Sequence, residues 1–172
     1  MRQIIPGLWQ GNLADLNLLG VPELREKYGF TLAMNVGNSP WVPRDVPTMY
    51  LRMYDVAAED DPERGRNNWQ LVLDALLMAA GEVTRGGKVL VVCNMGVSRS
   101  VVFSAMVVSI LEGIPMMVDP PYIMPSPFDT TNYDLVELVR SPSELMPSLE
   151  LWADAARALE TVKDEIRKLG RA

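Results

Sequence analysis

Short apolar runs separated by polar and turn-forming residues occupy the first third of the chain and predict short strands. Four runs have the length and composition of strands, and they cover residues 3–5, 8–12, 31–36 and 48–55. The Pro6-Gly7 pair predicts a turn between the first two runs, and a helix is predicted to continue from the second run to Tyr28.

Further along, the spacing changes to intervals of three and four, which is typical of amphipathic helices. A helix is predicted to begin at Trp69 and to end at the Gly86-Gly87 pair. Its expected buried face consists of Val72, Leu73, Leu76, Leu77, Ala80 and Val83. Residues 89–92 form a continuous apolar run, as expected of a central parallel strand covered on both faces. A helix over residues 99–112 follows, and Gly113 is its expected C-terminal stop.

The last third of the chain begins with a proline-rich segment at about 114–131, which is predicted to be an insertion without long regular structure. Thr131 with Asp134 approximates a capping box for a helix to Arg140, and apolar spacing predicts a final amphipathic helix over 152–166. Strands that alternate with helices predict an α/β fold. We expect three layers, with a mostly parallel central sheet of about five strands flanked by helices, in one domain spanning residues 1–172.

Composition narrows the chemistry. The 172 residues include one cysteine and no histidine, so an internal disulfide is impossible and a metal site or other cofactor is not expected. A net charge of -6 argues against binding to nucleic acid or to anionic membranes. The sequence has no apolar run of membrane-spanning length and no signal-peptide pattern, so we predict a cytoplasmic protein.

The segment after the predicted central strand carries the candidate chemistry. Cys93 ends the strand, five residues separate it from Arg99, and Arg99 opens the next helix. A loop of this length can turn its backbone N–H groups inward around an anion, and the helix N-terminus adds its dipole. The positive end of the helix dipole and the neighbouring arginine also stabilise a thiolate, so Cys93 is the predicted nucleophile. The predicted phosphate-binding residues are Asn94, Met95, Gly96, Val97, Ser98 and Arg99.

Two neighbours complete the predicted catalytic set. Arg99 offers a planar fork that can bind two phosphate oxygens. Ser100 is one residue further, where its hydroxyl could donate a hydrogen bond to a departing thiolate. The competing interpretation is that a lone buried cysteine is simply a small hydrophobic residue. The strand before, Gly96 in the loop and the helix after favour an anion-binding nucleophile loop instead.

The loop resembles the signature of dual-specificity phosphatases, within the protein tyrosine phosphatase superfamily, whose pattern is His-Cys-x-x-Gly-x-Ser-Arg-Ser. The opening residues 5–12 and the run at 33–36 resemble the first strands of the same family. The resemblance covers most of the chain apart from the proline-rich segment and the acidic loop before Trp69. It implies a phosphatase that forms a cysteinyl-phosphate intermediate without a cofactor.

The resemblance also implies an aspartate that protonates the leaving oxygen. Asp55 is the preferred candidate because it ends the run at 48–55, as the family's acid follows its strand. Counting back from Cys93 without gaps favours Asp60 or Asp61. For each of the three, a solvated acidic loop is the alternative interpretation.

One position departs from the family pattern, because Val92 stands where the resemblance implies histidine. That histidine orients the loop and favours the thiolate, so its replacement predicts weakened or retuned catalysis. The alternative is a catalytically weak module that binds phosphate through the loop and sequesters a phosphoprotein. Sulfur transfer or arsenate reduction is less favoured, because a reductase would need further cysteines.

The loop also bears on the substrate. None of its residues is a lysine, although inositol-lipid phosphatases of this kind tend to carry basic residues there. The predicted partners are therefore a phosphorylated protein, carrying phosphotyrosine or phosphoserine and phosphothreonine, or a small phosphate ester. The sequence leaves the oligomeric state open.

Overall fold

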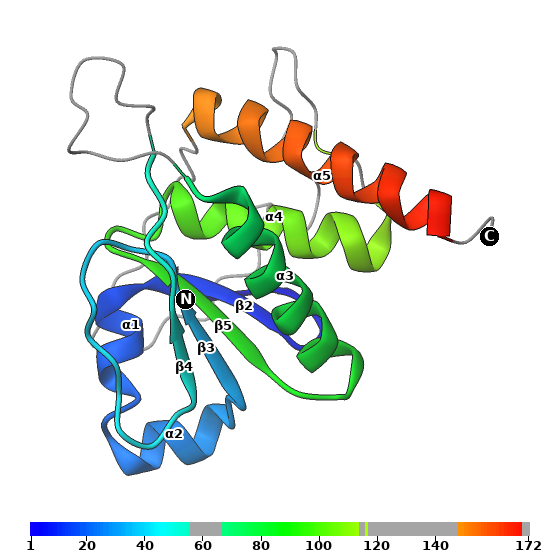
Figure 1. Cartoon of the computed structure of the whole chain (residues 1–172). Helices are drawn as coiled ribbons and strands as arrows, with labels where there is room; N and C mark the ends of the chain where they lie inside the picture. The colour runs from blue at the N-terminus through cyan, green and yellow to red at the C-terminus, as the bar shows by residue number, and fades with distance from the viewer. Residues whose placement is uncertain (56–66, 114–115, 117–147, 170–172) are drawn as a thin grey trace.

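The described part of the chain forms a sheet with helices on both faces (Figure 1). The computed structural model describes residues 1–55, 67–113, 116 and 148–169. The strands are β1 (Arg2–Ile5), β2 (Leu8–Asn12), β3 (Leu32–Asn35), β4 (Thr48–Tyr50) and β5 (Val89–Cys93). The helices are α1 (Leu13–Leu18), α2 (Pro22–Tyr28), α3 (Trp69–Thr84), α4 (Arg99–Glu112) and α5 (Leu149–Leu169).

The sheet is mixed but mostly parallel, as predicted. Its order is β1-β2-β5-β3-β4, so β5 is the central strand. Both neighbours of β5 are parallel to it, β3 and β4 are parallel, and only β1 pairs antiparallel, with β2. A parallel central strand must be covered on both faces, which explains the continuous apolar run in its sequence.

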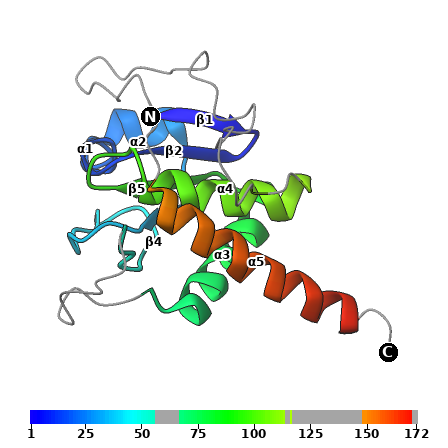
Figure 2. The ribbon, with the colours of Figure 1, turned by 90° about the horizontal axis from the view of Figure 1, so that it is seen from above.

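Alternate residues of β5 enter two different hydrophobic clusters. Val89, Val91 and Cys93 belong to the cluster that α3, α4 and α5 complete. Leu90 and Val92 belong to the cluster beneath α1 and α2. Figures 1 and 2 show these two groups of helices on opposite sides of the sheet, with α5 lying across α4. The predicted three-layer α/β fold is thus confirmed.

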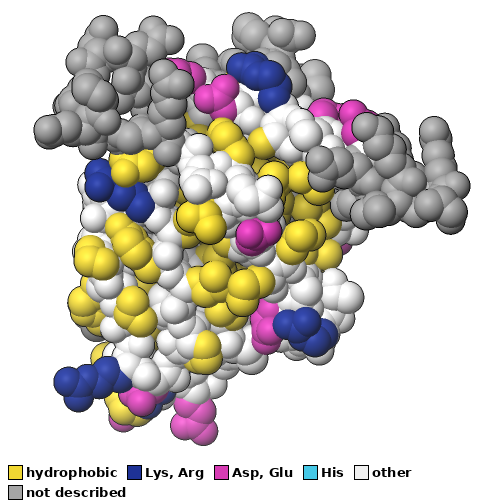
Figure 3. Space-filling model, in the orientation of Figure 1, with side chains coloured by type: hydrophobic (Ala, Val, Ile, Leu, Met, Phe, Trp, Pro, Cys, Tyr) yellow, Lys and Arg dark blue, Asp and Glu magenta, His cyan; other side chains and the backbone are white. Residues whose placement is uncertain are grey.

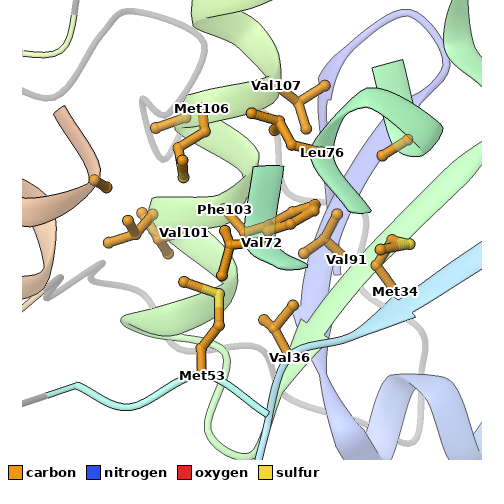
Figure 4. Close-up of a cluster of buried hydrophobic side chains, with 14 of the residues drawn as sticks. Met34, Val36, Met53, Val72, Leu76, Val91, Val101, Phe103, Met106 and Val107 are labelled. Atoms are coloured by element: carbon orange, nitrogen blue, oxygen red, sulfur yellow. The ribbon is translucent and has the colours of Figure 1, made fainter. Parts of the chain in front are cut away.

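Helix α4 is the centre of the larger cluster, because every residue from Ser100 to Ser109 is buried. The sheet lies beneath it, and α3 and α5 pack against its sides. Phe103, on α4, is fully buried between residues of the sheet and of α3 (Figure 4). Truncating such a phenylalanine to alanine typically costs about 3–5 kcal/mol. The helix that follows the candidate loop is therefore fixed in the core.

Three predictions about the elements need correction. The helix expected to reach Tyr28 is two helices, because Gly20 ends a turn after α1 and Pro22 starts α2 at its first position. The run at 48–55 is paired as a strand only over Thr48–Tyr50, although the Leu51 and Met53 N–H groups still bond to carbonyls of residues 35 and 36.

The third correction concerns α3. The apolar spacing predicts Leu77 on its buried face, but Leu77 is 50% exposed, because it lies about 140° around the helix from Val72. The helix predicted to end at Arg140 lies outside the described residues, as does the proline-rich segment except for Met116.

The surface of the described part carries scattered hydrophobic side chains among uncharged groups, with charged residues mostly toward the edges of the face in Figure 3. The large exposed hydrophobic residues are Val21, Trp41, Val42, Tyr50, Leu71, Leu77, Met78 and Met95. Among the described helices, none combines the length and apolar character needed to cross a bilayer. The cytoplasmic location and the single domain stay predictions from the sequence.

Candidate active site

Three parallel strands end together at one edge of the sheet, and Cys93 lies at the middle of that edge. In the register of the sheet, Asn12 of β2 pairs with Cys93, and Asn35 of β3 pairs with Val92. Ligands of open α/β sheets bind at the carboxyl ends of such strands. The order of strands therefore places the loop after Cys93 between the loops that follow β2 and β3.

The turn after Cys93 depends on Gly96, whose φ of 72° lies in the left-handed region. A Cβ atom there would also be 2.8 Å from the carbonyl oxygen of Gly11 and 3.0 Å from the Cβ atom of Asn12. Glycine is needed for both reasons, since it allows the positive φ and the close approach to β2. The loop then reaches Ser98, whose carbonyl accepts the first helical hydrogen bond of α4, from Val102.

Three protein groups surround the guanidinium of Arg99, one on its own loop and two on the segment after β4. Its Nη1 atom donates to the carbonyl of Met53 at 3.4 Å, and its Nη2 atom donates to Asn94 Oδ1 at 3.2 Å. Its Nε atom lies 3.7 Å from Asp55 Oδ2, in an ion pair whose side chains are 14% and 39% exposed. The arginine is therefore partly buried and oriented before any anion binds.

Asn94 connects the candidate loop to the loop after β3. Its Oδ1 atom accepts a hydrogen bond from the backbone N–H of Asn38 at 2.9 Å as well as the one from Arg99. The Asn94 amide group also donates to the side-chain oxygen of Asn38. A Cβ atom on Gly37 would displace Asn94 Oδ1 from this position, so a larger residue there would disturb the contact. Asn94 thus joins Arg99 to the β3 side of the site.

The thiol of Cys93 is 2% exposed and contacts a buried hydroxyl. Its Sγ atom lies 3.2 Å from Ser100 Oγ. Ser100 Oγ also lies 3.3 Å from the carbonyl oxygen of Gly11, to which it can donate. Gln10 Nε2 donates to the same hydroxyl at 2.8 Å and to the carbonyl of Gly96 at 2.7 Å. A buried chain of hydrogen bonds therefore runs from β2 to the sulfur.

Asp55 is bound to the candidate loop from the other side. Ser98 Oγ donates to Asp55 Oδ1 at 2.6 Å and accepts from the N–H of Ser148 at 2.8 Å. Ser148 Oγ donates to the Asp55 carbonyl at 2.6 Å and accepts from the N–H of Leu151, in the first turn of α5. Three segments distant in sequence thus meet at Ser98.

Val92 does not lie on the same side of the sheet as the thiol. It is fully buried in the cluster with Trp9, Leu16 and Leu90, under α1 and α2. Cys93 belongs to the opposite cluster. The residue at this position therefore contributes to packing behind the loop and has no polar contact to offer the sulfur.

The structure brings most of the predicted residues together. Arg99, Ser100 and Asp55 contact Cys93 or one another directly or through Ser98. Met95, at the tip of the loop, is 70% exposed, so its side chain points to solvent. The alternative acids Asp60 and Asp61 lie outside the described residues. The catalytic and phosphate-binding roles of all these residues stay predictions.

Sequence reasoning missed three residues of this arrangement, namely Gln10, Asn38 and Ser148. Gln10 gives a weak signal, because it is a polar residue that follows apolar Leu8 and Trp9 in a predicted strand. Asn38 and Ser148 give none, because each is a polar residue in a loop, and their contacts join segments more than 45 residues apart. Among the described residues, no three acidic, cysteine or histidine side chains gather as a metal site would require.

Comparison with known proteins identifies the fold. Human DUSP28 superposes with a TM-score of 0.66 at 18% identity, over 96% of this chain and 99% of the other. A mouse protein described as a dual specificity phosphatase, solved with zinc tungstate, gives 0.67 at 22% identity over 96% and 89%. The human tyrosine phosphatase-like serine/threonine/tyrosine-interacting protein gives 0.54 at 24% over 66% and 75%. No family model and no curated protein sequence matches the chain.

The chain therefore has the fold of the dual-specificity phosphatases. The predicted resemblance is confirmed at this level, over nearly the whole length of the chain.

Proposed function

We propose that the chain is a phosphatase that hydrolyses phosphomonoesters through a cysteinyl-phosphate intermediate on Cys93. One observation carries the proposal: a buried cysteine at the end of the central strand contacts Ser100, in the first turn of a helix that begins with Arg99. A packing cysteine needs neither an adjacent oriented guanidinium nor a buried hydroxyl. A nucleophile that must bind phosphate and later leave it needs both.

The first step breaks the ester bond. The Cys93 thiolate attacks phosphorus with its electron pair, an S–P bond forms, and the P–O bond to the substrate alcohol breaks. Asp55 is the proposed donor of the proton that the leaving oxygen takes up. Arg99 binds two of the phosphoryl oxygens and stabilises the charge on them during transfer.

The second step regenerates the enzyme. Water attacks phosphorus, the S–P bond breaks, and its electron pair returns to sulfur. The carboxylate of Asp55 accepts the proton from the attacking water, and Ser100 donates a hydrogen bond to the departing thiolate. Inorganic phosphate is the product, and no co-reactant besides water is required.

The proposed substrates are phosphotyrosine and phosphoserine or phosphothreonine in proteins, with small phosphate esters as the simpler option. Support comes from the loop, which carries Asn94, Met95 and Val97 and no basic side chain besides Arg99. The mouse neighbour was solved with tungstate, a tetrahedral oxyanion of similar shape to phosphate.

The contacts of the Asp55 carboxylate favour a second candidate function, a module that binds phosphate without hydrolysing it. Both of its carboxylate oxygens already contact protein groups, Ser98 on one side and Arg99 on the other. To protonate a leaving group, a carboxyl oxygen must reach the substrate, whereas Ser98 Oγ holds Oδ1 at 2.6 Å. Such a module would not need that contact with a substrate, and one structural neighbour is itself a phosphatase-like interacting protein.

The deciding experiment measures hydrolysis of p-nitrophenyl phosphate by the native chain and by Cys93→Ser, Arg99→Lys and Asp55→Asn. We expect no turnover from Cys93→Ser, and a loss of about 10²–10⁴-fold from Asp55→Asn if it is the acid. Mass spectrometry of acid-quenched native protein should detect one added phosphoryl group, and Cys93→Ser should lack it.

Each alternative gives its own result. Background turnover by the native chain, together with saturable binding of tungstate that Arg99→Lys weakens, would establish the binding module. Normal activity of Asp55→Asn with a crippled Asp60→Asn or Asp61→Asn would assign the acid to the residue whose substitution abolishes activity. Phosphotyrosine and phosphothreonine peptides of one sequence then rank the substrates.

A further inference from the structure

We propose that Gln10 is a positioning residue of this site, and the proposal rests on the function proposed above. Its amide group donates to the hydroxyl of Ser100, which leaves that hydroxyl's proton free to bond an ionised sulfur of Cys93, and it holds the loop at Gly96. Gln10 touches neither sulfur nor substrate, so it acts through Ser100 and through the backbone of the loop.

The position of Gln10 is unusual for a polar side chain. It lies on β2, opposite Val91 of the central strand, and it is 1% exposed. Burying an amide without hydrogen bonds costs about 1–3 kcal/mol in protein mutational data. The hydrogen bonds of this amide with Gly96 and Ser100 therefore offset the cost of burying it in the sheet.

The orientation of the amide follows from its neighbours. The carbonyl oxygen of Gly96 can only accept a hydrogen bond, so the amide atom 2.7 Å from it must be the nitrogen. The same nitrogen lies 2.8 Å from Ser100 Oγ, and an amide nitrogen can only donate. Ser100 Oγ is therefore the acceptor of that bond, and one of its two lone pairs is used.

The single proton of Ser100 then has two possible acceptors. The carbonyl oxygen of Gly11 lies 3.3 Å from Oγ, and the sulfur of Cys93 lies 3.2 Å from it. With a neutral thiol, S–H donates to the remaining lone pair and the hydroxyl donates to Gly11. With a thiolate, the hydroxyl turns to sulfur. The bond from Gln10 keeps Oγ in place and polarises its O–H group, so it strengthens the bond to the thiolate.

The second contact of the amide holds the loop. The bond to the Gly96 carbonyl keeps that oxygen on the β2 side, where the loop already lies in contact with Gly11 and Asn12. A carbonyl oxygen that faced a bound anion would repel it. Gln10 therefore supports anion binding as well as the ionised sulfur.

Other charged groups surround the same loop and must stay constant in any test. Arg99 and Asp55 flank it from α4 and from the segment after β4. On the side of α1, Asp15 lies against Gly11 and is paired with the Met1 ammonium group at 3.3 Å. None of these groups is altered by substituting Gln10, so a change in the titration of Cys93 reports the lost amide.

The test titrates the thiol directly, which is possible because Cys93 is the only cysteine. Thiolate absorbance in the ultraviolet and the pH dependence of alkylation by iodoacetamide are measured for the native chain, Gln10→Met, Ser100→Ala and the double variant. We expect the midpoint to rise by about one pH unit in Ser100→Ala, the equivalent of one hydrogen bond to a charged group, and by less in Gln10→Met, which weakens that bond without removing it. The double variant should shift little further than Ser100→Ala alone.

Gln3→Met is the matched control, because Gln3 is an exposed glutamine on the adjacent strand β1. It should titrate as the native chain does. Circular dichroism melts identify any variant that fails to fold. If Gln10→Met does not fold, the side-chain N–H₂ resonances of Gln10 in the native chain carry the test, and they should shift with the same midpoint as the thiol.

Kinetics extend the test to turnover. Breakdown of the phosphoenzyme, followed as a burst with p-nitrophenyl phosphate, should slow by up to about tenfold in Gln10→Met, so kcat and KM fall together while kcat/KM changes less. An unchanged midpoint in folded Gln10→Met, or Gln10 resonances insensitive to thiol ionisation, overturns the proposal. If the midpoint shifts but the native chain has no turnover, Gln10 keeps its positioning role and the hydrolase proposal fails.

Discussion

The hydroxyl of Ser98 donates a 2.6 Å hydrogen bond to the carboxylate of Asp55, and so joins the candidate phosphate loop to the segment after β4. Ser148, at the start of α5, binds both partners, since its N–H donates to Ser98 Oγ and its hydroxyl donates to the Asp55 carbonyl. Asp55 is thus held by its side chain and by its backbone. Its position depends on two serines that are 50 residues apart.

Substituting Ser98 and Ser148 should separate these two restraints. Ser98→Ala removes the side-chain bond, and Ser148→Ala removes the bond to the Asp55 carbonyl. We expect each to lower kcat for p-nitrophenyl phosphate about tenfold by loosening Asp55, with little change in KM. Ser109→Ala, on the same helix as the site but bonded to Lys163, is the matched control. Native kcat in both serine variants would show that the restraint on Asp55 has no catalytic use.

Gly96 should be intolerant of any side chain. Gly96→Ala combines a φ of 72° with a Cβ atom 2.8 Å from the Gly11 carbonyl oxygen, so the loop must shift. We expect a stability loss of about 1–3 kcal/mol and loss of tungstate binding. Gly29→Ala is the control, because φ is 63° there but no atom lies within 4 Å of the added Cβ. It should lose stability by urea denaturation yet keep its tungstate affinity.

Restoring histidine at position 92 should not improve the site. Val92 is fully buried in the cluster under α1 and α2, so Val92→His places a ring with two polar nitrogens among apolar side chains. We expect a loss of about 1–3 kcal/mol in the free energy of unfolding, measured by urea denaturation, and no fall in the pH midpoint of Cys93 alkylation. A lower midpoint in this variant would mean that the imidazole reaches the loop from the far face of the sheet.

Acid stability should depend on Glu82, at the C-terminal end of α3. Hydrogen bonds from Thr31 and then from Arg85 hold the pKa of Glu82 below its ordinary value of 4.5. A depressed pKa in the folded state stabilises the fold above the unfolded-state pKa, and this stabilisation is lost as the pH falls through the folded value. Glu82→Gln should therefore be less stable than the native chain at pH 7 and approach it below about pH 4. Glu26→Gln, an exposed glutamate with no such bonds among the described residues, should show no convergence.

The sequence predicts an element well when the residues of that element determine its type and its ends. The run at 89–92 had no polar position and proved to be in the central strand. The bounds of α4 were predicted as observed, because Gly113 adopts a φ of 68° and ends the helix. The prediction for Leu77 is wrong because the apolar residues of α3 cover a wider part of the helix surface than the face that is buried.

The candidate site was predictable as far as it is local in sequence. Cys93, Gly96 and Arg99 lie within one short segment, and their spacing carries the signal. By contrast, Gln10 and Ser100 are 90 residues apart in the sequence, and Ser98 and Ser148 are 50 residues apart. Polar residues of this kind acquire a role only from the register of the sheet and the path of α5, which no spacing in the chain encodes.

The burial of α4 on every side has a consequence for how a substrate could be accommodated. A helix whose residues 100–109 all pack in the interior cannot slide or rotate without opening the core on both flanks. The start of α4, which carries Ser100 beside the sulfur of Cys93, is therefore held in a fixed position. A substrate of a different shape must therefore be accommodated by the loops around the start of this helix and not by movement of the helix itself.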